Sequence, residues 1–311
     1  MSERVRITDV SPRDGLQNEP ARVPTADKVR LIEFLCATGV DEVEATSFVS
    51  PKWIPQLGDA EDVLASLELE AGREGPALSA LVPNEKGFER ALAIHQGGRP
   101  LKIAVFTAAS ETFSRKNTNA SIAETIERFG VFLPRAFEAG MAVRMYVSCA
   151  VACPFEGAIE PGAVRRVTDA LLALAPGGGV DVEIDLGDTI GAATPESLSA
   201  LLDAFPEEAM RRRIALHLHD TFGRAASCVR RGLELGVRRF DGAVAGIGGC
   251  PYAGTPEKPA PGNIDTELLV GTIHDAGFET GVDMDALKRA GDFARQILAQ
   301  CRAAAVKGGA S

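Results

Sequence analysis

Residues 181–219 read DVEIDLGDTIGAATPESLSALLDAFPEEAMRRRIALHLH and carry the pattern that decides the fold. Segments 181–186 and 213–219 are short runs in which apolar residues recur as in buried strands. Between them, Thr194-Pro195-Glu196 is a helix start, with proline at the first helical position. A strand, a helix and a second strand in this order are typical of a parallel sheet.

The same alternation runs from end to end of the chain. Helix-length segments such as Thr25–Thr38, with Thr25 as its N-cap and Gly39 beyond its end, separate the strand candidates. Eight strands with intervening helices predict an α/β fold of the (β/α)8 TIM-barrel type. The alternative, a doubly wound sheet, is disfavoured because no G-x-G-x-x-G follows the first strand. The strand candidates are 4–10, 41–48, 77–82, 101–107, 142–149, 181–186, 213–219 and 240–246.

A single large domain fits this reading. The barrel is expected to occupy residues 1–280 as a catalytic domain, and residues 281–311 are expected to form a C-terminal helical extension packed on it. Within that extension, Met284–Ala305 has the pattern of an amphipathic helix.

Composition narrows the class of protein further. The 311 residues include 33 basic and 43 acidic side chains, a net charge of −10, which argues against a general nucleic-acid or anionic-membrane binder. A local basic pocket for an anionic small molecule stays possible. The six cysteines have no dense disulfide spacing, and the N-terminus has no leader-like segment. We therefore expect reduced thiols and a cytoplasmic protein.

The segment Leu216–Thr221, LHLHDT, supplies the clearest chemical signal. His217 and His219 are two residues apart and so share one face of the predicted strand. Two of only four histidines in the chain stand here. In a barrel, reactive groups gather at the C-terminal ends of strands. Asp14, after the first strand, would then face them, and an O/N/N set suits a divalent cation such as Mg²⁺ or Mn²⁺. The alternative is a pair of buried histidines bonded to the backbone.

Other strand ends carry further candidates. Arg13 precedes Asp14, and Glu44 lies near the end of the second strand on the face shared with Glu42 and Thr46. An acidic cluster including Asp188 follows the sixth strand. Cys250 lies between glycines and proline in a loop after the eighth strand, which would allow a thiol to move over a substrate.

These segments resemble 3-hydroxy-3-methylglutaryl-CoA (HMG-CoA) lyases, metal-dependent TIM-barrel enzymes. The resemblance covers about Arg4 to Ala276, nearly the whole barrel, and its SFVSPKW and GGCPY blocks are more specific than the RDG and HxH motifs. It rests on the segments SPRDGLQNE, EATSFVSPKWIPQLGD, YVSCAVACPFEG, LGDTIG, LHLHDTFG and GIGGCPY.

The resemblance implies a retro-Claisen cleavage of HMG-CoA to acetyl-CoA and acetoacetate, and a role for each matching residue. Arg13 would steady the thioester oxygen as enolate charge develops, Cys250 would donate a proton, and Glu44 would support Arg13. The general base stays open between Asp14 and His217. The cation would be held by Asp14, His217, His219 and Asn263. Asp188 would act close to the substrate, with contacts from Gln17, Ser47, Lys52 and Thr189.

Three alternatives remain at this point. The segment 254–261 makes the loop between Cys250 and Asn263 longer than the family pattern and adds three prolines, so a lyase for another 3-hydroxy-3-alkyl acyl-CoA is one of them. The others are a Claisen-type synthase or aldolase on the same barrel, and a non-catalytic ligand-binding barrel. Fold-level analogy favours a homodimer through the C-terminal and outer barrel helices. Lys52, Arg115 and Lys116 are candidates for binding the CoA phosphates.

Overall fold

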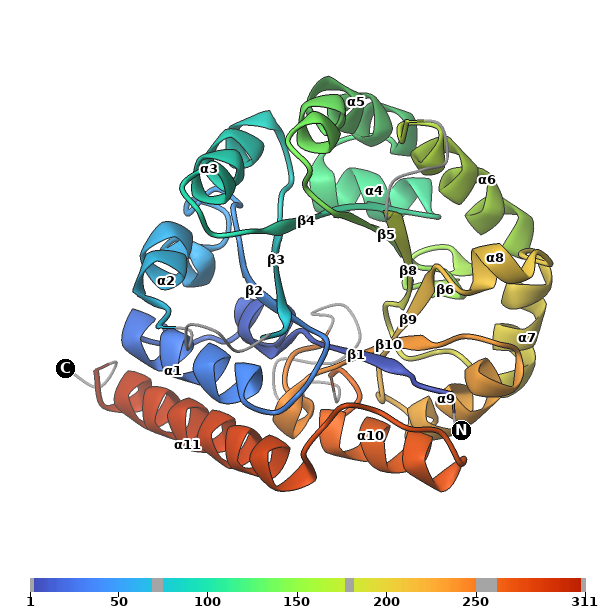
Figure 1. Cartoon of the computed structure of the whole chain (residues 1–311). Coiled ribbons are helices and arrows are strands. Elements are labelled where there is room, and N and C mark those ends of the chain that lie inside the picture. Colours follow the sequence, from blue (N-terminus) through green and yellow to red (C-terminus); the bar gives the residue numbers. More distant parts are fainter. Residues whose placement is uncertain (1–2, 69–74, 177–181, 250–261, 309–311) are drawn as a thin grey trace.

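The computed structural model describes residues 3–68, 75–176, 182–249 and 262–308, with the side chains of 305–308 left out. Eight parallel strands close into a barrel in the order β1-β10-β9-β8-β5-β4-β3-β2. Figure 1 looks down the barrel, with the helices forming a ring outside the strands. The strands are β1 (Arg6–Asp9), β2 (Glu42–Ser47), β3 (Ala77–Leu81), β4 (Lys102–Ala108), β5 (Val143–Ser148), β8 (Val182–Asp188), β9 (Ile214–Leu218) and β10 (Arg239–Gly242).

All eight predicted strands are present, so the barrel prediction is confirmed and the doubly wound alternative is wrong. A small antiparallel hairpin, β6 (Ala152–Cys153) with β7 (Gly157–Ala158), lies outside the barrel sheet. The helices are α1 (Thr25–Cys36), α2 (Ala60–Ser66), α3 (Glu85–Gln96), α4 (Glu111–Thr118), α5 (Ile122–Glu138), α6 (Pro161–Leu172), α7 (Pro195–Asp203), α8 (Glu208–Arg211), α9 (Ala225–Glu234), α10 (Thr266–Asp275) and α11 (Met284–Gly308).

Local sequence explains several helix boundaries. Thr194 caps α7 by accepting a hydrogen bond from the Ser197 backbone N–H, as its Thr-Pro-Glu start predicts. The predicted N-cap at Thr25 is wrong. Pro24 is the N-cap, and Thr25 is the first helical residue, with its hydroxyl donating to Asp59 at 2.7 Å. Gly39 has a φ of +83°, the left-handed conformation expected after the helix.

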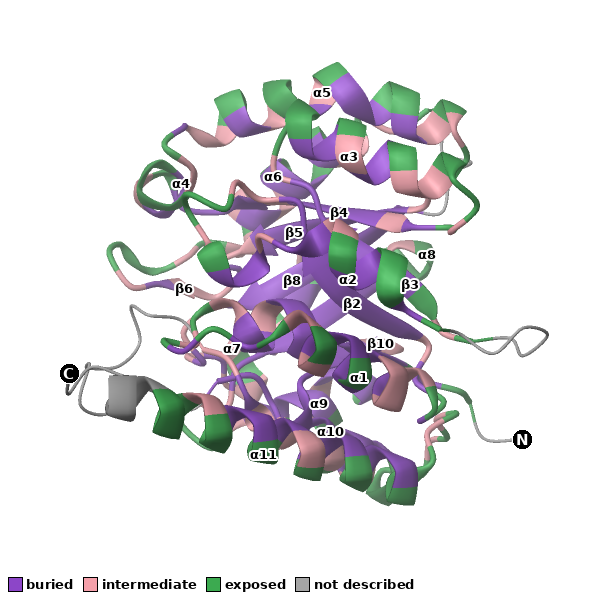
Figure 2. Ribbon diagram, turned by 90° about the vertical axis from the view of Figure 1, so that its left-hand side faces the viewer, coloured by how far each residue is buried: buried purple, intermediate pink, exposed green. Residues whose placement is uncertain are grey.

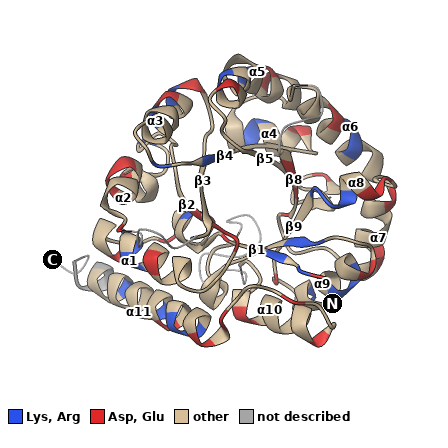
Figure 3. Ribbon diagram, viewed as in Figure 1, with Lys and Arg blue, Asp and Glu red and all other residues tan. Residues whose placement is uncertain are grey.

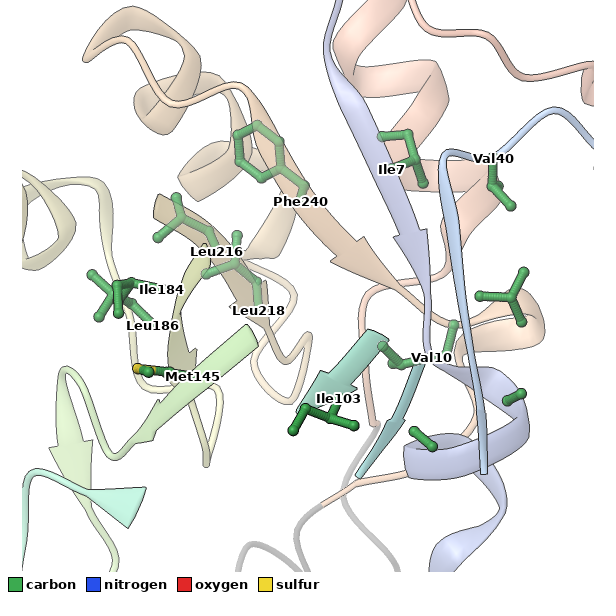
Figure 4. Close-up of a cluster of buried hydrophobic side chains, with 14 of the residues drawn as sticks. Ile7, Val10, Val40, Ile103, Met145, Ile184, Leu186, Leu216, Leu218 and Phe240 are labelled. Carbon is green, nitrogen blue, oxygen red and sulfur yellow. The ribbon is translucent and has the colours of Figure 1, made fainter. Parts of the chain in front are cut away.

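The main hydrophobic core lies between the barrel wall and the helices. Alternate strand residues such as Ile184, Leu186, Leu216 and Leu218 are buried in it, and Figure 4 shows these side chains on neighbouring strands. Figure 2 shows the helices with buried and exposed faces. Residues of the opposite parity must point to the other side of the strand, into the barrel.

The barrel interior is consequently polar and charged. Inward positions include Arg144 on β5, Glu183 and Asp185 on β8, and Asp241 on β10, all of them buried. Figure 3 marks basic positions on β4 and acidic positions on β8. Polar and charged side chains inside the barrel can take part in binding and catalysis, whereas a purely aliphatic interior could only pack.

Helix α11 packs beside α1, and Figures 1 and 2 show it on the outside of the barrel. The Phe34 and Phe293 rings lie 5.1 Å apart between the two helices, and the Arg30 guanidinium covers both rings. This packing agrees with the expected C-terminal helix. Among the described helices, none is both long enough and apolar enough to cross a membrane.

Candidate active site

Arg13 and Asp14 stand on a single π-helical turn, η1 (Ser11–Gly15), which follows β1 directly. The backbone N–H of Gly15 donates to the Val10 carbonyl at 3.1 Å and closes the turn. Asp9, the last residue of β1, anchors the turn by accepting hydrogen bonds from the Ser11 and Val244 backbone N–H groups. π-Helical turns are rare and are frequent at functional sites. Here the turn presents two consecutive charged side chains to the end of the barrel.

His217 and His219 reach the same point from β9. Their Nε2 atoms lie 3.2 Å apart, and Asp14 Oδ2 is 4.0 Å from His217 Nε2. The ligand atoms of Asp14, His217 and His219 all lie within 4.8 Å of one another. The predicted meeting of β1 and β9 across β10 is therefore present in the fold.

Asn263 joins this group from the segment after the last barrel strand. Its side-chain amide donates to Asp14 Oδ2 at 2.9 Å and to the Ile247 carbonyl at 3.1 Å. Its backbone pairs with that of His219 in an isolated bridge. The four predicted metal ligands thus lie together, although they come from three separate parts of the chain.

The donor set fits a divalent cation. Neighbouring ligands around a cation with bonds of about 2.1 Å are about 3 Å apart, which matches the 3.2 Å between the two imidazole nitrogens. One carboxylate, two imidazoles and an amide are ligands that Mg²⁺, Mn²⁺ or a similar cation accepts. We call Asp14, His217, His219 and Asn263 the upper cluster.

The surroundings of Asp14 and His219 favour the protonation states that these two ligands need to bind a cation. Burial would raise the pKa of Asp14, but the neighbouring Arg13 and the two histidines outweigh it and lower the pKa to about 2. Burial and the neighbouring His217 together lower the pKa of His219 to about 4. An ionised carboxylate and a neutral imidazole are the protonation states that bind a metal.

Arg13 forms a buried ion pair directly beside the upper cluster. Its Nε donates to Glu44 Oε2 at 2.6 Å, and its NH1 donates to Asp14 Oδ1 at 2.6 Å. The charges of Glu44 and Asp14 outweigh burial, which by itself lowers the pKa of Arg13, and raise it above its ordinary value. The Tyr146 ring lies 5.5 Å from the guanidinium carbon. Arg13 is therefore a fixed positive charge at the end of the barrel.

These residues open into a cavity of about 640 Å³. Its walls combine Arg13, Asp14, His217 and His219 with apolar side chains and with a rim formed by the β2–α2 loop, α4 and the start of α5. This volume is within the range of small-molecule sites. The lining includes Arg13, Asp14, Gln17, Asn18, Trp53, Asn84, Phe106, Lys116, Arg128, Tyr146, Thr189, His217 and His219.

The remaining predicted site residues have varied positions. Gln17 and Thr189 line the cavity, whereas Ser47 is fully buried and accepts a hydrogen bond from the Val49 backbone N–H. Lys52 is exposed and does not line the cavity. Asp188 accepts a hydrogen bond from the Ala193 backbone N–H before α7, also away from the lining.

Cys250 lies outside the described residues, as does the loop 254–261. The prediction that Glu42, Glu44 and Thr46 share one face holds for Glu42 and Glu44 but is wrong for Thr46, because the pairing of β2 with β3 shifts register between Glu44 and Thr46. A bulge moves later residues to the opposite face of a strand.

Two residues that the sequence reasoning missed stand near the site. Tyr146 lines the cavity, and its hydroxyl lies 3.3 Å from Glu44 Oε2. Asp241 lies 3.3 Å from His217 Nδ1. Alternation could have found both, since Tyr146 follows Arg144 by two residues on β5 and Asp241 faces inward on β10.

Comparisons with known proteins place this geometry in context. The sequence profile of the HMGL-like family matches residues 4–294. The mitochondrial hydroxymethylglutaryl-CoA lyase of Mus musculus is 44% identical over 298 residues, covering 96% of this chain and 87% of that protein.

Solved structures agree. An HMG-CoA lyase from Brucella melitensis has a TM-score of 0.86 at 46% identity, over 95% of this chain and 99% of that one. An HMG-CoA lyase from Acinetobacter baumannii, solved with coenzyme A and 3-methylmalate, has a TM-score of 0.85 at 33% identity, over 95% and 92% of the two chains.

Proposed function

Because this chain belongs to the HMGL-like family, we propose that it cleaves HMG-CoA to acetyl-CoA and acetoacetate with the help of a divalent cation. The observation that carries the proposal is that Asp14, His217 and His219 meet Arg13 in the lining of one cavity. Cation ligands and a fixed guanidinium in one place are what a retro-Claisen cleavage needs, because charge develops on two oxygens of the substrate.

Asp14, His217, His219 and Asn263 would hold the cation, with Mg²⁺ and Mn²⁺ as our candidates. A bound divalent cation would lower the pKa of the tertiary hydroxyl of the substrate and polarise its oxygen. The general base stays open between Asp14 and His217, both of which lie at this centre.

Arg13 would act on the other half of the substrate. As the C2–C3 bond breaks, its electron pair passes to the acetyl-CoA half as an enolate, and acetoacetate leaves as the ketone. The guanidinium would stabilise the enolate oxygen, and Glu44 would keep it in place through the buried pair at 2.6 Å. Protonation at C2 then gives acetyl-CoA, and Cys250 is our candidate donor for this proton.

The cavity lining also offers basic side chains to the CoA part of the substrate. Its wall opposite the upper cluster includes Lys116 on α4 and Arg128 on α5, and exposed Trp53 stands at its rim. Basic side chains there would bind the CoA phosphates despite the net charge of −10. Lys116 supports the predicted role better than Lys52, since Lys116 lines the cavity.

We retain roles for the other predicted residues as proposals. Gln17 and Thr189 would contact the substrate from the cavity wall. Asp188 would act indirectly, because its carboxylate fixes the backbone that leads into α7. For Ser47 and Lys52, substrate binding would require contacts beyond the described cavity.

The decisive experiment measures acetyl-CoA release from a panel of 3-hydroxy-3-alkyl acyl-CoA thioesters with Mg²⁺ or Mn²⁺. We expect HMG-CoA to be the best substrate, and His217→Ala to lose nearly all activity. His274→Ala, on the exposed end of α10, is the matched control and should keep wild-type rates. Turnover of a longer homologue without turnover of HMG-CoA would assign the chain to the sister activity. Absence of any release would contradict the lyase proposal.

Three further predictions accompany the function. We propose a homodimer, testable by light scattering, and a domain division at residues 280 and 281, testable by limited proteolysis. We also propose a cytoplasmic location, supported by the free thiols of Cys36, Cys153, Cys228 and Cys301 among the described residues. The mouse relative is mitochondrial, so cell fractionation has to decide the compartment.

A further inference from the structure

A second group of potential metal ligands lies deeper in the barrel. Atoms of Asp185, His217 and Asp241 come within 4.8 Å of one another, and all three residues are buried. We call this group, with Arg144, the lower cluster. It shares His217 with the upper cluster, so the two are in direct contact through one imidazole ring.

Arg144 already supplies the positive charge of the lower cluster. Its NH1 donates to both oxygens of Asp241, at 2.9 and 2.8 Å, and lies 3.4 Å from Asp185 Oδ2. Its NH2 pairs with Glu183 and donates to Thr8 Oγ1 at 2.7 Å. A guanidinium held on so many sides leaves no place for a metal ion. The lower cluster must therefore serve another purpose.

That purpose follows from the two nitrogens of His217. Nδ1 lies 3.3 Å from Asp241 Oδ2, whereas Nε2 lies 3.2 Å from His219 Nε2 in the upper cluster. Because Arg144 donates to both oxygens of Asp241, that carboxylate is ionised and can only accept from His217. The ring proton is thereby held on Nδ1, and the lone pair of Nε2 faces the cation site.

We propose that Asp241, clamped by Arg144, is the positioning residue that fixes the tautomer and orientation of His217 for cation binding. This inference rests on the proposed function, because it assumes a cation at the upper cluster. A carboxylate behind a metal-binding histidine typically changes metal affinity 10- to 100-fold. His219 provides an internal contrast, since among the described residues no carboxylate accepts a hydrogen bond from it.

The substitution Asp241→Asn tests the assignment with almost no change in shape. Arg144 has only donors, so it would attract the amide oxygen of the new side chain and turn its NH2 group towards His217. An NH2 donor facing Nδ1 favours the opposite tautomer, with the proton on Nε2, where the cation should bind. We expect Asp241→Asn to weaken Mn²⁺ binding by about 10- to 100-fold.

The matched control is Asp185→Asn in the same buried cluster. Burial and the neighbouring Asp241 raise the pKa of Asp185 well above its ordinary value, and asparagine keeps the size and shape of this side chain. Among the described residues, Asp185 has no hydrogen bond to His217. Its substitution should leave the Mn²⁺ affinity within about threefold of the wild type.

The experiment measures Mn²⁺ binding by calorimetry and by the EPR signal of free Mn²⁺, without substrate. ¹⁵N spectra of histidine-labelled, metal-free protein report the tautomer in parallel, with His217→Gln identifying the signal. We expect the proton of His217 on Nδ1 in the wild type and on Nε2 in Asp241→Asn. The tautomer of the wild type tests the inference even if the variant does not fold.

The outcomes separate the two proposals. Wild-type protein that binds no Mn²⁺ and no Mg²⁺ would overturn the metal part of the proposed function. Wild-type protein that binds Mn²⁺, together with an Asp241→Asn variant of equal affinity or a wild-type His217 protonated on Nε2, would overturn only the positioning role. A lower melting temperature with unchanged affinity would mean that Asp241 merely stabilises the barrel, and would also overturn it.

Discussion

The upper and lower clusters both contain carboxylate groups and share His217, but they differ in where their positive charge comes from. Both gather carboxylates around His217 inside one barrel. In the lower cluster, Arg144 compensates the acidic groups from within the chain, and its side chain is fully buried. In the upper cluster, Asp14 and two imidazoles face a cavity and leave room for a cation from solution. An acidic cluster that is neutralised by an arginine of the same chain therefore stabilises the barrel, whereas a cluster that faces a cavity can bind a cation from solution.

The largest expected effect is a loss of stability when the ion pairs of the lower cluster are removed. Arg144→Met would leave Asp241 and Glu183 buried without their common partner. Removing one partner of a buried ion pair costs about 3–5 kcal/mol, and we expect at least this loss in the free energy of unfolding, measured with urea. Arg115→Met on exposed α4 is the control and should stay within about 0.5 kcal/mol. An equally small effect for Arg144→Met would remove the distinction between scaffold and site.

The next effect removes the positive charge beside the upper cluster. Arg13→Gln removes the guanidinium that would stabilise the enolate, and loss of one such donor lowers kcat by about 100- to 1,000-fold. Steady-state kinetics with HMG-CoA and Mn²⁺ measure this change. Arg289→Gln, exposed on α11, should have wild-type kcat. A variant at Arg13 that retains most of kcat would contradict the assigned role.

A bound cation should stabilise the folded protein through its contacts with the upper cluster. A ligand present at about 100 times its Kd adds about 2.7 kcal/mol to the free energy of unfolding. We therefore expect Mn²⁺ to raise the melting temperature of wild-type protein but not that of His219→Ala. The control His95→Ala should respond as the wild type does, because His95 packs on α3, far along the chain from these ligands. A persistent Mn²⁺ effect in His219→Ala would place the cation elsewhere.

An effect of similar size is the pH dependence of stability that Asp188 should cause. Burial raises the pKa of Asp188 from 3.8 to about 6 in the folded protein. Its contribution to stability is therefore complete below pH 3.8 and is lost as the pH rises through 6. At about 1.4 kcal/mol per unit, the loss amounts to roughly 2–3 kcal/mol.

Urea unfolding at several pH values checks this sign. Asp188→Asn should lack the decline between pH 4 and pH 7 that the wild type shows relative to it. Asp203→Asn, on the exposed side of α7, should decline as the wild type does. A wild type that gains stability relative to Asp188→Asn over this range would mean that Asp188 is ionised at little cost.

The sequence predicted much of the upper cluster because its residues stand in short, strongly patterned segments. His217 and His219 can be recognised by their spacing of two residues on one strand, and Asp14 lies shortly after the end of another strand. The eight strands were predictable for the same reason, since aliphatic residues recur in each. The upper cluster thus depends mainly on local pattern and on the known geometry of a barrel.

The lower cluster was not predicted, and the reason is physical. Charged residues in strands look in sequence like positions that are exposed to water, and this holds for Arg144 and Asp241 and for Glu183, which pairs with Arg144. Only closure of the barrel brings them together, 97 residues apart in the case of Arg144 and Asp241. The bulge in β2 and the Thr25–Asp59 hydrogen bond likewise depend on tertiary contacts that local propensity does not contain.

Anomalous diffraction at the manganese edge, from crystals soaked in Mn²⁺, tests the contrast between the two clusters most directly. We expect one peak per chain within bonding distance of Asp14, His217 and His219, and no peak between Asp185 and Asp241, where Arg144 lies. A peak in the lower cluster, or an upper cluster without one at saturating Mn²⁺, would contradict this expectation.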